Sequence, residues 1–367
     1  MVEREVMIRK LVVEGITVFP QKVSFDFVSG INVIVGGNDS GKSHLMKLSY
    51  ALSKWSEKSP RREFPETWAE EERLRRYLLH AFGTQELSAI ASRHAHAGEA
   101  RVHASLQGEK APLGSAEVSF SFSPGREEEG LSIATMPQRF LQEGSLFIPP
   151  REVLSLFPCY MQVGKRYPDL LDATCRDLCQ ALETPPGQVE IAPEMRAVLR
   201  LIEALLHGKL TRHNARFLLQ RGKQAPMELS LVAEGFKRLG TLGLLLANGA
   251  LRPGTTLFWD EPEMNLNATH LPLLCRIMLG LCQAGVQLML TTHSLFLLRE
   301  LVICLNQPSM SGVLRRFIGL QPPPSPNSAV RVSAGNSLDE ISPLESLDAE
   351  MEQADRYLRM PNLPYSG

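Results

Sequence analysis

The sequence predicts an α/β fold in which a mixed β-sheet is interrupted by a helical lobe, and three observations support this prediction. The apolar run 31–35 ends in glycines, as a buried central strand would, and Leu45, Leu48, Leu52 and Trp55 then recur at a helical spacing. A second alternation of apolar strands and leucine-rich helices covers residues 228–320. Residues 165–222 between them have the pattern of helices, with a break expected at 184–187.

The other elements follow in order along the chain. Residues 5–35 contain three short strands, residues 57–98 are charged and helix-prone, and residues 100–135 return to strand-like alternation. We expect 145–150 to be a strand that is stopped by prolines and followed by a helix. The segment 321–327 indicates a linker or loop, and 329–334 a last strand.

A final helix is predicted after residue 342. Ser342, Pro343 and Glu345 form a capping box with proline at the first helical position. One face of this helix carries an apolar stripe, made of Leu344, Leu347, Met351, Ala354 and Leu358. The stripe could pack on the protein's own core or dock a partner.

Composition and charge narrow the class of protein. The chain has 367 residues, 44% of them hydrophobic and 22% charged, which is typical of globular proteins and excludes wholesale disorder. A net charge of −1 gives no overall attraction to nucleic acid or to a membrane. There is no secretory segment and no run of about 18 apolar residues. We therefore expect a soluble, cytoplasmic protein that does not contact a membrane.

Six cysteines are present, and none forms a C-x-x-C pair. Cys175 and Cys179 are one helical turn apart, so they could bind a metal or form a strained crosslink. Buried thiols in a reducing compartment explain all six more simply.

The segment from Gly36 to Ser43, GGNDSGKS, fits the phosphate-binding pattern G-x-x-x-x-G-K-[ST] and has the required strand before it and helix after it. Glycines allow backbone N–H groups to surround phosphate oxygens, and the helix N-terminus favours the same anion. Lys42 is expected to reach the β- and γ-phosphates, and the Ser43 hydroxyl to bind Mg²⁺. We assign nucleotide binding to the loop and the residue after it: Gly36, Asn38, Ser40, Gly41, Lys42, Ser43 and His44.

Carboxylates end the apolar strand 255–260. Asp260 is expected to hold Mg²⁺, together with Ser43, and Glu261 to act as general base toward the attacking water. The next strand, 286–290, ends in TTHS, where His293 can bind the γ-phosphate and Ser294 can cap the following helix. The sequence therefore predicts two catalytic residues, Glu261 and His293.

One further segment distinguishes among phosphate-loop families. Gly235 stands 25 residues before Asp260, within the sequence LVAEGFKRL, and a leucine-rich helix follows it. Here the chain resembles the ABC-ATPase family, and more narrowly the AAA-type heads of SMC, RecF and OLD-like proteins, in a stand-alone form without a TOPRIM domain. The resemblance covers 36–43, 233–239, 257–268 and 291–296.

The resemblance implies an ABC-ATPase head whose two copies close around ATP. In this family a signature loop, here Ala233, Glu234 and Gly235 followed by Lys237, binds the partner subunit's nucleotide. The implied protein is a Mg²⁺-dependent ATPase that forms a homodimer and controls a separate effector, a nuclease or toxin, in phage defence or DNA metabolism. About 75 residues follow His293, too few for a nuclease domain of its own.

The sequence departs from the family pattern at several positions. Ala233 replaces the signature serine, Asn267 and Ala268 replace a histidine and a proline, and Leu295 replaces a proline. The glutamine that contacts Mg²⁺ in the family cannot be assigned among Gln138, Gln142 and Gln162. Two other functions remain open, the cytosolic ATPase subunit of an ABC transporter and a DNA-repair head that acts on DNA directly.

The sequence pattern and the positions of the motifs divide the chain into five expected segments. These are the first part of the ATPase core (1–56), a helical insertion and strand lobe (57–150), a helical lobe (151–227), the second part of the core (228–320), and a linker with the C-terminal helix (321–367).

Two charged runs lie outside the motifs. The charged run Glu72–Arg76 is interpreted as a solvated helix face. A basic stretch in the helical lobe is either a charged helix face or a track for the phosphates of DNA or RNA; it comprises Lys209, Arg212, His213, Arg216, Arg221 and Lys223.

Overall fold

A computed structural model describes the chain over residues 8–57, 66–93, 98–106, 116–123, 130–137, 144–167, 171–322, 329–341 and 345–359. Its centre is a six-stranded sheet in the order β14-β13-β3-β12-β11-β7. Five of these strands are parallel, and β14 pairs antiparallel with β13 at one edge. The strands are β3 (Ile31–Gly36), β7 (Ser145–Ile148), β11 (Thr256–Asp260), β12 (Gln287–Thr292), β13 (Arg315–Gln321) and β14 (Arg331–Gly335).

Two hydrophobic cores cover the two faces of this sheet, and the strands alternate between them. Val33, Leu257 and Leu288 face one core, whereas their neighbours Ile34, Phe258 and Met289 face the other. This division follows from the two-residue period of a strand that is buried on both sides. The continuous apolar runs in the sequence are therefore explained.

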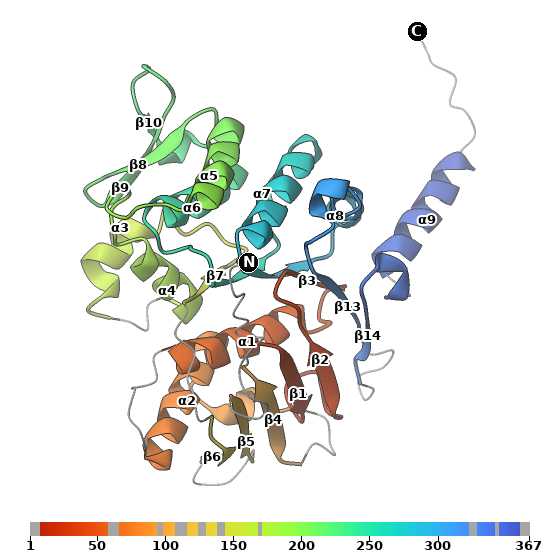
Figure 1. Ribbon diagram of the computed structural model, residues 1–367. Helices are drawn as coiled ribbons and strands as arrows, with labels where there is room; N and C mark the ends of the chain where they lie inside the picture. The colour runs from red at the N-terminus through yellow and green to blue at the C-terminus, as the bar shows by residue number, and fades with distance from the viewer. Residues whose placement is uncertain are drawn as a thin grey trace.

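Helices cover one face of the sheet (Figure 1). The helices of this core are α4 (Ala173–Ala181), α5 (Pro193–Leu206), α6 (Glu234–Ala247), α7 (Leu271–Gln283) and α8 (Leu295–Leu305). A short helix α3 (Phe157–Cys159) and the π-helical segment Tyr160–Gly164 connect β7 to this side. The break predicted at 184–187 lies between α4 and α5, because two prolines and a glycine cannot continue a helix there.

On the other face, α1 (Lys42–Glu57) and α2 (Thr67–Phe82) pack beside a five-stranded antiparallel sheet, as Figure 1 shows. This second sheet has the order β2-β1-β4-β5-β6. Its strands are β1 (Lys10–Glu14), β2 (Val23–Asp26), β4 (Ala100–Ser105), β5 (Glu117–Phe122) and β6 (Leu131–Thr135). This second sheet therefore combines β1 and β2, which precede α1 in the chain, with β4, β5 and β6, which follow it.

Part of the expected helical lobe is a sheet instead. A small antiparallel sheet is formed by three strands, β8 (Lys209–His213), β9 (Arg216–Gln220) and β10 (Met227–Glu228). The helical prediction for this stretch was therefore wrong. Asn214 has a φ of 55°, which suits the tight turn between β8 and β9, and Phe217 and Leu219 point inward at a spacing of two. The guanidinium of Arg212 donates hydrogen bonds to the carbonyls of Leu182 and Glu183. The basic stretch is therefore not one charged helix face.

The C-terminal helix α9 spans Glu345–Leu358, as predicted, but the expected capping residues 342–344 lie outside the described part of the chain. Of the predicted apolar stripe, the structure describes the side chain of Leu358, which is exposed. The predicted last strand is β14, which joins the central sheet.

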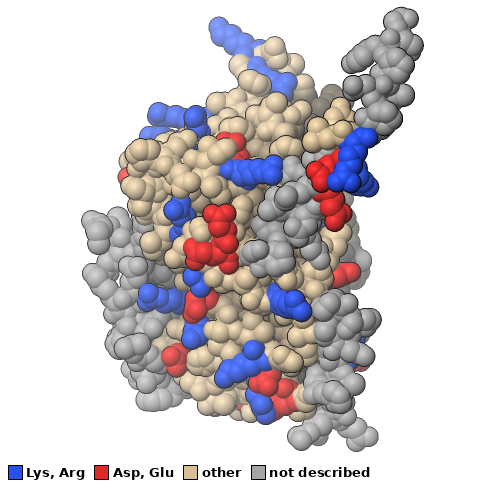
Figure 2. Space-filling view, turned by 90° about the vertical axis from the view of Figure 1, so that its right-hand side faces the viewer, with Lys and Arg blue, Asp and Glu red and all other residues tan. Residues whose placement is uncertain are grey.

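Charged side chains of both signs lie on the surface, and most of the cysteines are buried. On the face drawn in Figure 2, basic and acidic side chains of the described residues are interspersed. Five cysteines are buried and Cys159 is exposed, so the expectation that all six are buried was wrong for that residue. Within the described ranges, no helix is long and apolar enough to cross a bilayer.

Candidate nucleotide site

The phosphate-loop segment connects β3 to α1, and two of its glycines are required by close packing. A Cβ on Gly36 would lie 2.3 Å from the carbonyl oxygen of Leu320, and Gly41 has a φ of 93°. Asn38 is exposed at the tip, whereas Ser40 is buried. The Ser40 hydroxyl has no hydrogen-bond partner among the described residues. The loop thus has glycines that leave its backbone accessible and a Ser40 hydroxyl without a partner, and both features are typical of a site that binds an anion.

Lys42 lies across this loop. Its ammonium group donates hydrogen bonds of 2.8 Å and 2.7 Å to the carbonyl oxygens of Gly36 and Gly37. Burial lowers the pKa of Lys42, and the nearby carboxylates of Glu261 and Asp260 oppose that shift. The Lys42 ammonium group therefore lies between the carbonyls of the loop and the carboxylates that follow β11.

Asp260 and Ser43 meet although they are far apart in the chain. The Ser43 hydroxyl donates to Asp260 Oδ2 at 3.2 Å, and the Thr291 hydroxyl donates to the other carboxylate oxygen. Because β3, β12 and β11 are parallel neighbours, their carboxyl ends share one edge of the sheet. A hydroxyl beside a carboxylate is a donor set that suits Mg²⁺ with phosphate oxygens and water as its other ligands.

Glu261 and His293, which the sequence placed at one nucleotide site with separate roles, also come together. The Nδ1 atom of His293 lies 3.0 Å from Glu261 Oε1. Glu261 has a φ of 48°, an unusual conformation for a residue other than glycine, and its backbone N–H donates to both Thr291 oxygens. Its side chain is 18% exposed and that of His293 is 54% exposed, so both can reach a ligand at the surface. The turn after β11 thus aims a carboxylate outward.

Sequence reasoning missed two residues at this edge. Arg238 of α6 is buried, and its guanidinium donates to the backbone carbonyls of Asp260 at 2.8 Å and Glu261 at 2.7 Å. Glu263 accepts a hydrogen bond from the Thr292 hydroxyl, and burial raises the pKa of its carboxyl group. An arginine beside an otherwise apolar helix, GTLGLLLA, was the signal that could have marked Arg238.

The signature residues lie at the start of α6, apart from the phosphate loop. Ala233 is the N-cap residue, and it is exposed together with Glu234. Gly235 is buried, and a Cβ there would lie 2.4 Å from the carbonyl oxygen of Asn265. Lys237 is buried and forms an ion pair of 2.6 Å with Glu234. In the described part of the chain, no hydrogen bond or ion pair connects these residues to Gly36–Ser43.

Three remaining predictions concern neighbouring positions. His44 is exposed on α1, and its ring lies 5.9 Å from that of Phe82. Ser294 caps α8 through a hydrogen bond from the Leu297 N–H, as expected. Gln162 is exposed on the π-helical segment Tyr160–Gly164, whereas Gln138 and Gln142 lie outside the described residues.

The fold and this site define a class of protein, an α/β domain in which a phosphate-loop segment connects a central parallel strand to a helix. Two solved structures have the same fold, with TM-scores of 0.52. One is an Smc head bound to the C-terminal winged-helix domain of ScpA, with 14% identity, covering 90% of this chain and 98% of that chain. The other is the Smc head of Pyrococcus furiosus with an extended coiled coil, bound to the C-terminal domain of ScpA, with 13% identity and coverages of 96% and 99%.

Sequence comparison adds the family. Residues 50–299 match the profile described as "AAA domain, putative AbiEii toxin, Type IV TA system". The chain belongs to this AAA-domain family. The matched region includes the signature, the carboxylates and His293, and it begins after the phosphate loop. The comparison with curated proteins found no match.

Proposed function

We propose that this protein is an ATPase that binds ATP between two copies of the chain and hydrolyses it in order to control a separate effector. One observation carries the proposal. Ser43 meets Asp260, and Glu261 meets His293, at one edge of the sheet, while two of the signature residues, Ala233 and Glu234, are exposed at the start of α6. We infer that a single copy carries the catalytic residues of one site and, at the start of α6, an exposed surface that would complete the site of a second copy.

The geometry suggests how each residue acts. Lys42 would leave the carbonyls of Gly36 and Gly37 and bind phosphate oxygens instead, since they are stronger acceptors. Ser43 and Asp260 would hold a Mg²⁺ ion, which when bound neutralises charge on the β- and γ-phosphates. The carboxylate of Glu261 would accept a proton from the attacking water, and His293 would keep that carboxylate oriented.

Exposed apolar side chains near the site support closure of two copies. Leu231 precedes the signature and is 74% exposed, Met264 follows the carboxylates and is 36% exposed, and Phe296 follows His293 and is 65% exposed. Large apolar side chains at such positions are typical of surfaces that become buried in an assembly. We propose that ATP brings these surfaces together, with Ala233, Glu234 and Gly235 against the partner's phosphates.

The effector and the context are proposed from the relatives. The two Smc heads are described as bound to a separate protein, and the family description names a putative toxin of a toxin–antitoxin system. We propose that the effector here is a separate nuclease or toxin, in a cytoplasmic system of phage defence or DNA metabolism. This step rests on analogy between folds.

The substitution Glu261→Gln tests the proposal. We expect a stable dimer in ATP and Mg²⁺ and hydrolysis at least about a hundredfold slower, because nucleotide binds but water is not activated. Light scattering after size exclusion measures the mass, and phosphate release measures turnover. Lys42→Ala is the control, and it should stay monomeric without binding ATP. A monomer of Glu261→Gln at saturating ATP would contradict closure around nucleotide.

A further inference from the structure

The end of β7 reaches the same edge of the sheet as the candidate nucleotide site. β7 pairs in parallel with β11, and Ile148 lies opposite Trp259, so the residues after Ile148 lie beside Asp260. The guanidinium of Arg238 donates to the carbonyl of Pro149 at 3.3 Å and to that of Asp260 at 2.8 Å, which holds the two strand ends together. The turn that follows β7 is therefore next to the carboxylates of the site.

This turn presents one arginine to solvent. Pro149 and Pro150 fix two backbone φ angles. Further along the turn, the carboxylate oxygens of Glu152 accept hydrogen bonds from the Ser155 N–H at 3.2 Å and 3.1 Å. Arg151 lies between these fixed points, and its side chain is 66% exposed. The backbone of Arg151 is thus held in place while its side chain can move.

The carboxylate that Arg151 contacts holds it only weakly. A guanidinium nitrogen lies 3.5 Å from Asp172 Oδ2, and the Asp172 side chain is itself 31% exposed. The other carboxylate oxygen of Asp172 accepts hydrogen bonds from the Thr174 hydroxyl and the Cys175 N–H, which cap α4. Exposed ion pairs contribute little to stability, because water screens both charges. Asp172 would therefore keep its capping bonds if Arg151 moved away.

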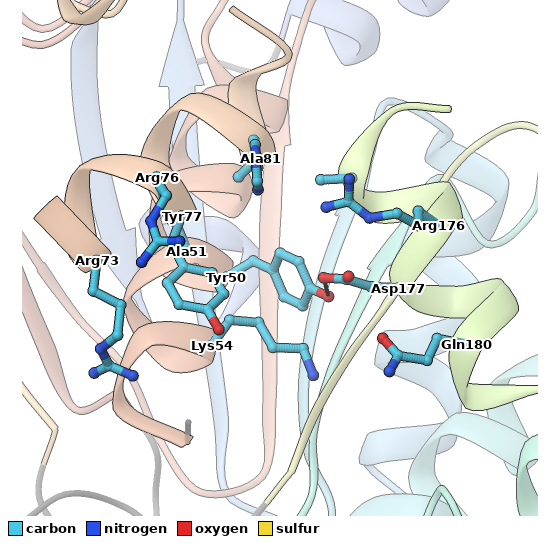
Figure 3. A pocket seen from close by; sticks show the side chains of 12 residues that line it. Tyr50, Ala51, Lys54, Arg73, Arg76, Tyr77, Ala81, Arg176, Asp177 and Gln180 are labelled. Carbon is cyan, nitrogen blue, oxygen red and sulfur yellow. Dashed lines mark hydrogen bonds between the residues drawn. The ribbon is translucent and has the colours of Figure 1, made fainter. Parts of the chain in front are cut away.

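Helix α4 is held against α1, the helix that begins at Lys42 in the phosphate loop. Asp177 of α4 accepts a hydrogen bond of 2.8 Å from the Tyr50 hydroxyl of α1, beside the cavity that both helices line (Figure 3). β7 contacts both helices as well. A movement of Arg151 from Asp172 toward a phosphate would therefore involve its own side chain and not these helices.

Negative charge accumulates on the β11 side of the site. Asp260 and Glu261 lie there, and a bound triphosphate would add more negative charge beside Lys42. Arg238 is buried and donates its hydrogen bonds to backbone carbonyls, so its guanidinium is already used. Arg151, by contrast, is an exposed cation that follows the strand next to β11, and adjacent strands are about 4.8 Å apart.

We propose that Arg151 is a further phosphate-binding residue of this site, and that its guanidinium leaves Asp172 to bind the terminal phosphate of ATP. The inference rests on the proposed function and extends it to the turn after β7. A phosphate group offers oxygens that match the paired N–H donors of a guanidinium, whereas Asp172 offers one oxygen at 3.5 Å. In that position Arg151 would also stabilise the charge that develops during phosphoryl transfer.

A comparison of two nucleotides tests this role in the full-length chain. Arg151→Gln should weaken the binding of AMP-PNP, a non-hydrolysable ATP analogue, about tenfold in the presence of Mg²⁺, because a charge-assisted contact with the terminal phosphate is lost. The affinity for ADP should be unchanged, because ADP lacks that phosphate, and this result also verifies that the variant is folded. Isothermal titration measures both affinities.

Asp172→Asn is the matched control. It removes the charge that holds Arg151, while asparagine can still cap α4. We expect this variant to bind AMP-PNP at least as tightly as the unaltered chain, because Arg151 no longer has to leave an ion pair. If the pair between Arg151 and Asp172 acted only by holding the turn against α4, both substitutions would instead weaken the binding equally.

Three outcomes would overturn the proposal: an unchanged affinity of Arg151→Gln for AMP-PNP, an equal loss for ADP, or an equal loss in Asp172→Asn. A loss that appears only at protein concentrations at which the chain dimerises would also overturn it, in favour of a contact with the second copy. Failure of the unaltered chain to bind either nucleotide would instead reject the proposed function itself. The affinities are measured without hydrolysis, so they are independent of the turnover test of Glu261.

Discussion

At the scale of single residues, the backbone after β11 is held by one buried side chain. The guanidinium group of Arg238 donates hydrogen bonds to four backbone carbonyl oxygens, which belong to Pro149, Asp260, Glu261 and Met264. Desolvation lowers the pKa of this guanidinium, and the carboxylates nearby oppose the shift. Arg238 therefore links α6, where the signature begins, to the turn that aims Glu261.

Replacing Arg238 should separate this structural effect from nucleotide binding. For Arg238→Met we expect a loss of about 3 kcal/mol in the free energy of unfolding, because buried carbonyls lose a charged donor. ATP affinity should persist through Lys42, while turnover falls. Urea unfolding and nucleotide titration measure the two effects, and Arg238→Lys should be intermediate. Unchanged stability would show that the guanidinium bonds are not made in solution.

Cysteine reactivity is a second prediction for single residues. Burial raises the pKa of Cys175 and of Cys179 to about 12, whereas Cys159 is exposed. Since the thiolate is the reactive form, iodoacetamide at pH 8 should label Cys159 first in the native protein. Mass spectrometry of peptides identifies the site, and urea should expose the remaining thiols. Early labelling of Cys175 would contradict the packing of α4.

At the scale of elements, the start of α6 packs tightly on the loop after β11. Gly235 has no room for a side chain beside Asn265 and Leu266. This contact gives the signature glycine a role inside one chain, in addition to the proposed contact with a partner's nucleotide. Movement of α6 would therefore move the loop that follows Glu261.

Gly235→Ala tests this contact. We expect a loss of about 2 kcal/mol of stability, because the added methyl group meets the backbone of Asn265. Gly312→Ala is the matched control, since nothing lies within 4 Å of a Cβ there. Thermal unfolding compares the two proteins. Equal melting temperatures would mean that α6 and the loop are less closely packed than described.

At the scale of the whole molecule, each chain carries both halves of the proposed site on separate surfaces. Lys42 and Glu261 lie at the edge of the sheet, and Ala233 and Glu234 are exposed at the start of α6. Dimerisation should therefore depend on ATP and on exposed apolar residues, and not on the stability of the single chain.

Leu231→Glu should prevent closure of the dimer. In the Glu261→Gln background, a charge at this 74% exposed position should weaken ATP-dependent association about tenfold or more without changing the melting temperature. Trp68→Glu, also at an exposed position but on α2, is the control. Analytical ultracentrifugation measures the association. If both substitutions weaken it equally, the signature side is not specifically involved.

The sequence by itself determined the elements that carry the proposed catalytic residues. The phosphate loop, the carboxylates after β11 and the histidine after β12 each follow an apolar strand, and parallel strands bring their carboxyl ends to one edge. The meeting of Ser43 with Asp260, and of Glu261 with His293, was predictable for this reason.

Only the tertiary structure decided the remaining features, because they depend on contacts between distant parts of the chain. Short charged segments such as 209–220 fit a helix or a hairpin by pattern alone, and the burial of Phe217 and Leu219 selects the hairpin. The role of Arg238 depends on carbonyls more than twenty residues away. Arg76 of α2 and Arg176 of α4 are a hundred residues apart in the sequence, and they line one cavity because these two helices, which pack on separate cores, contact each other.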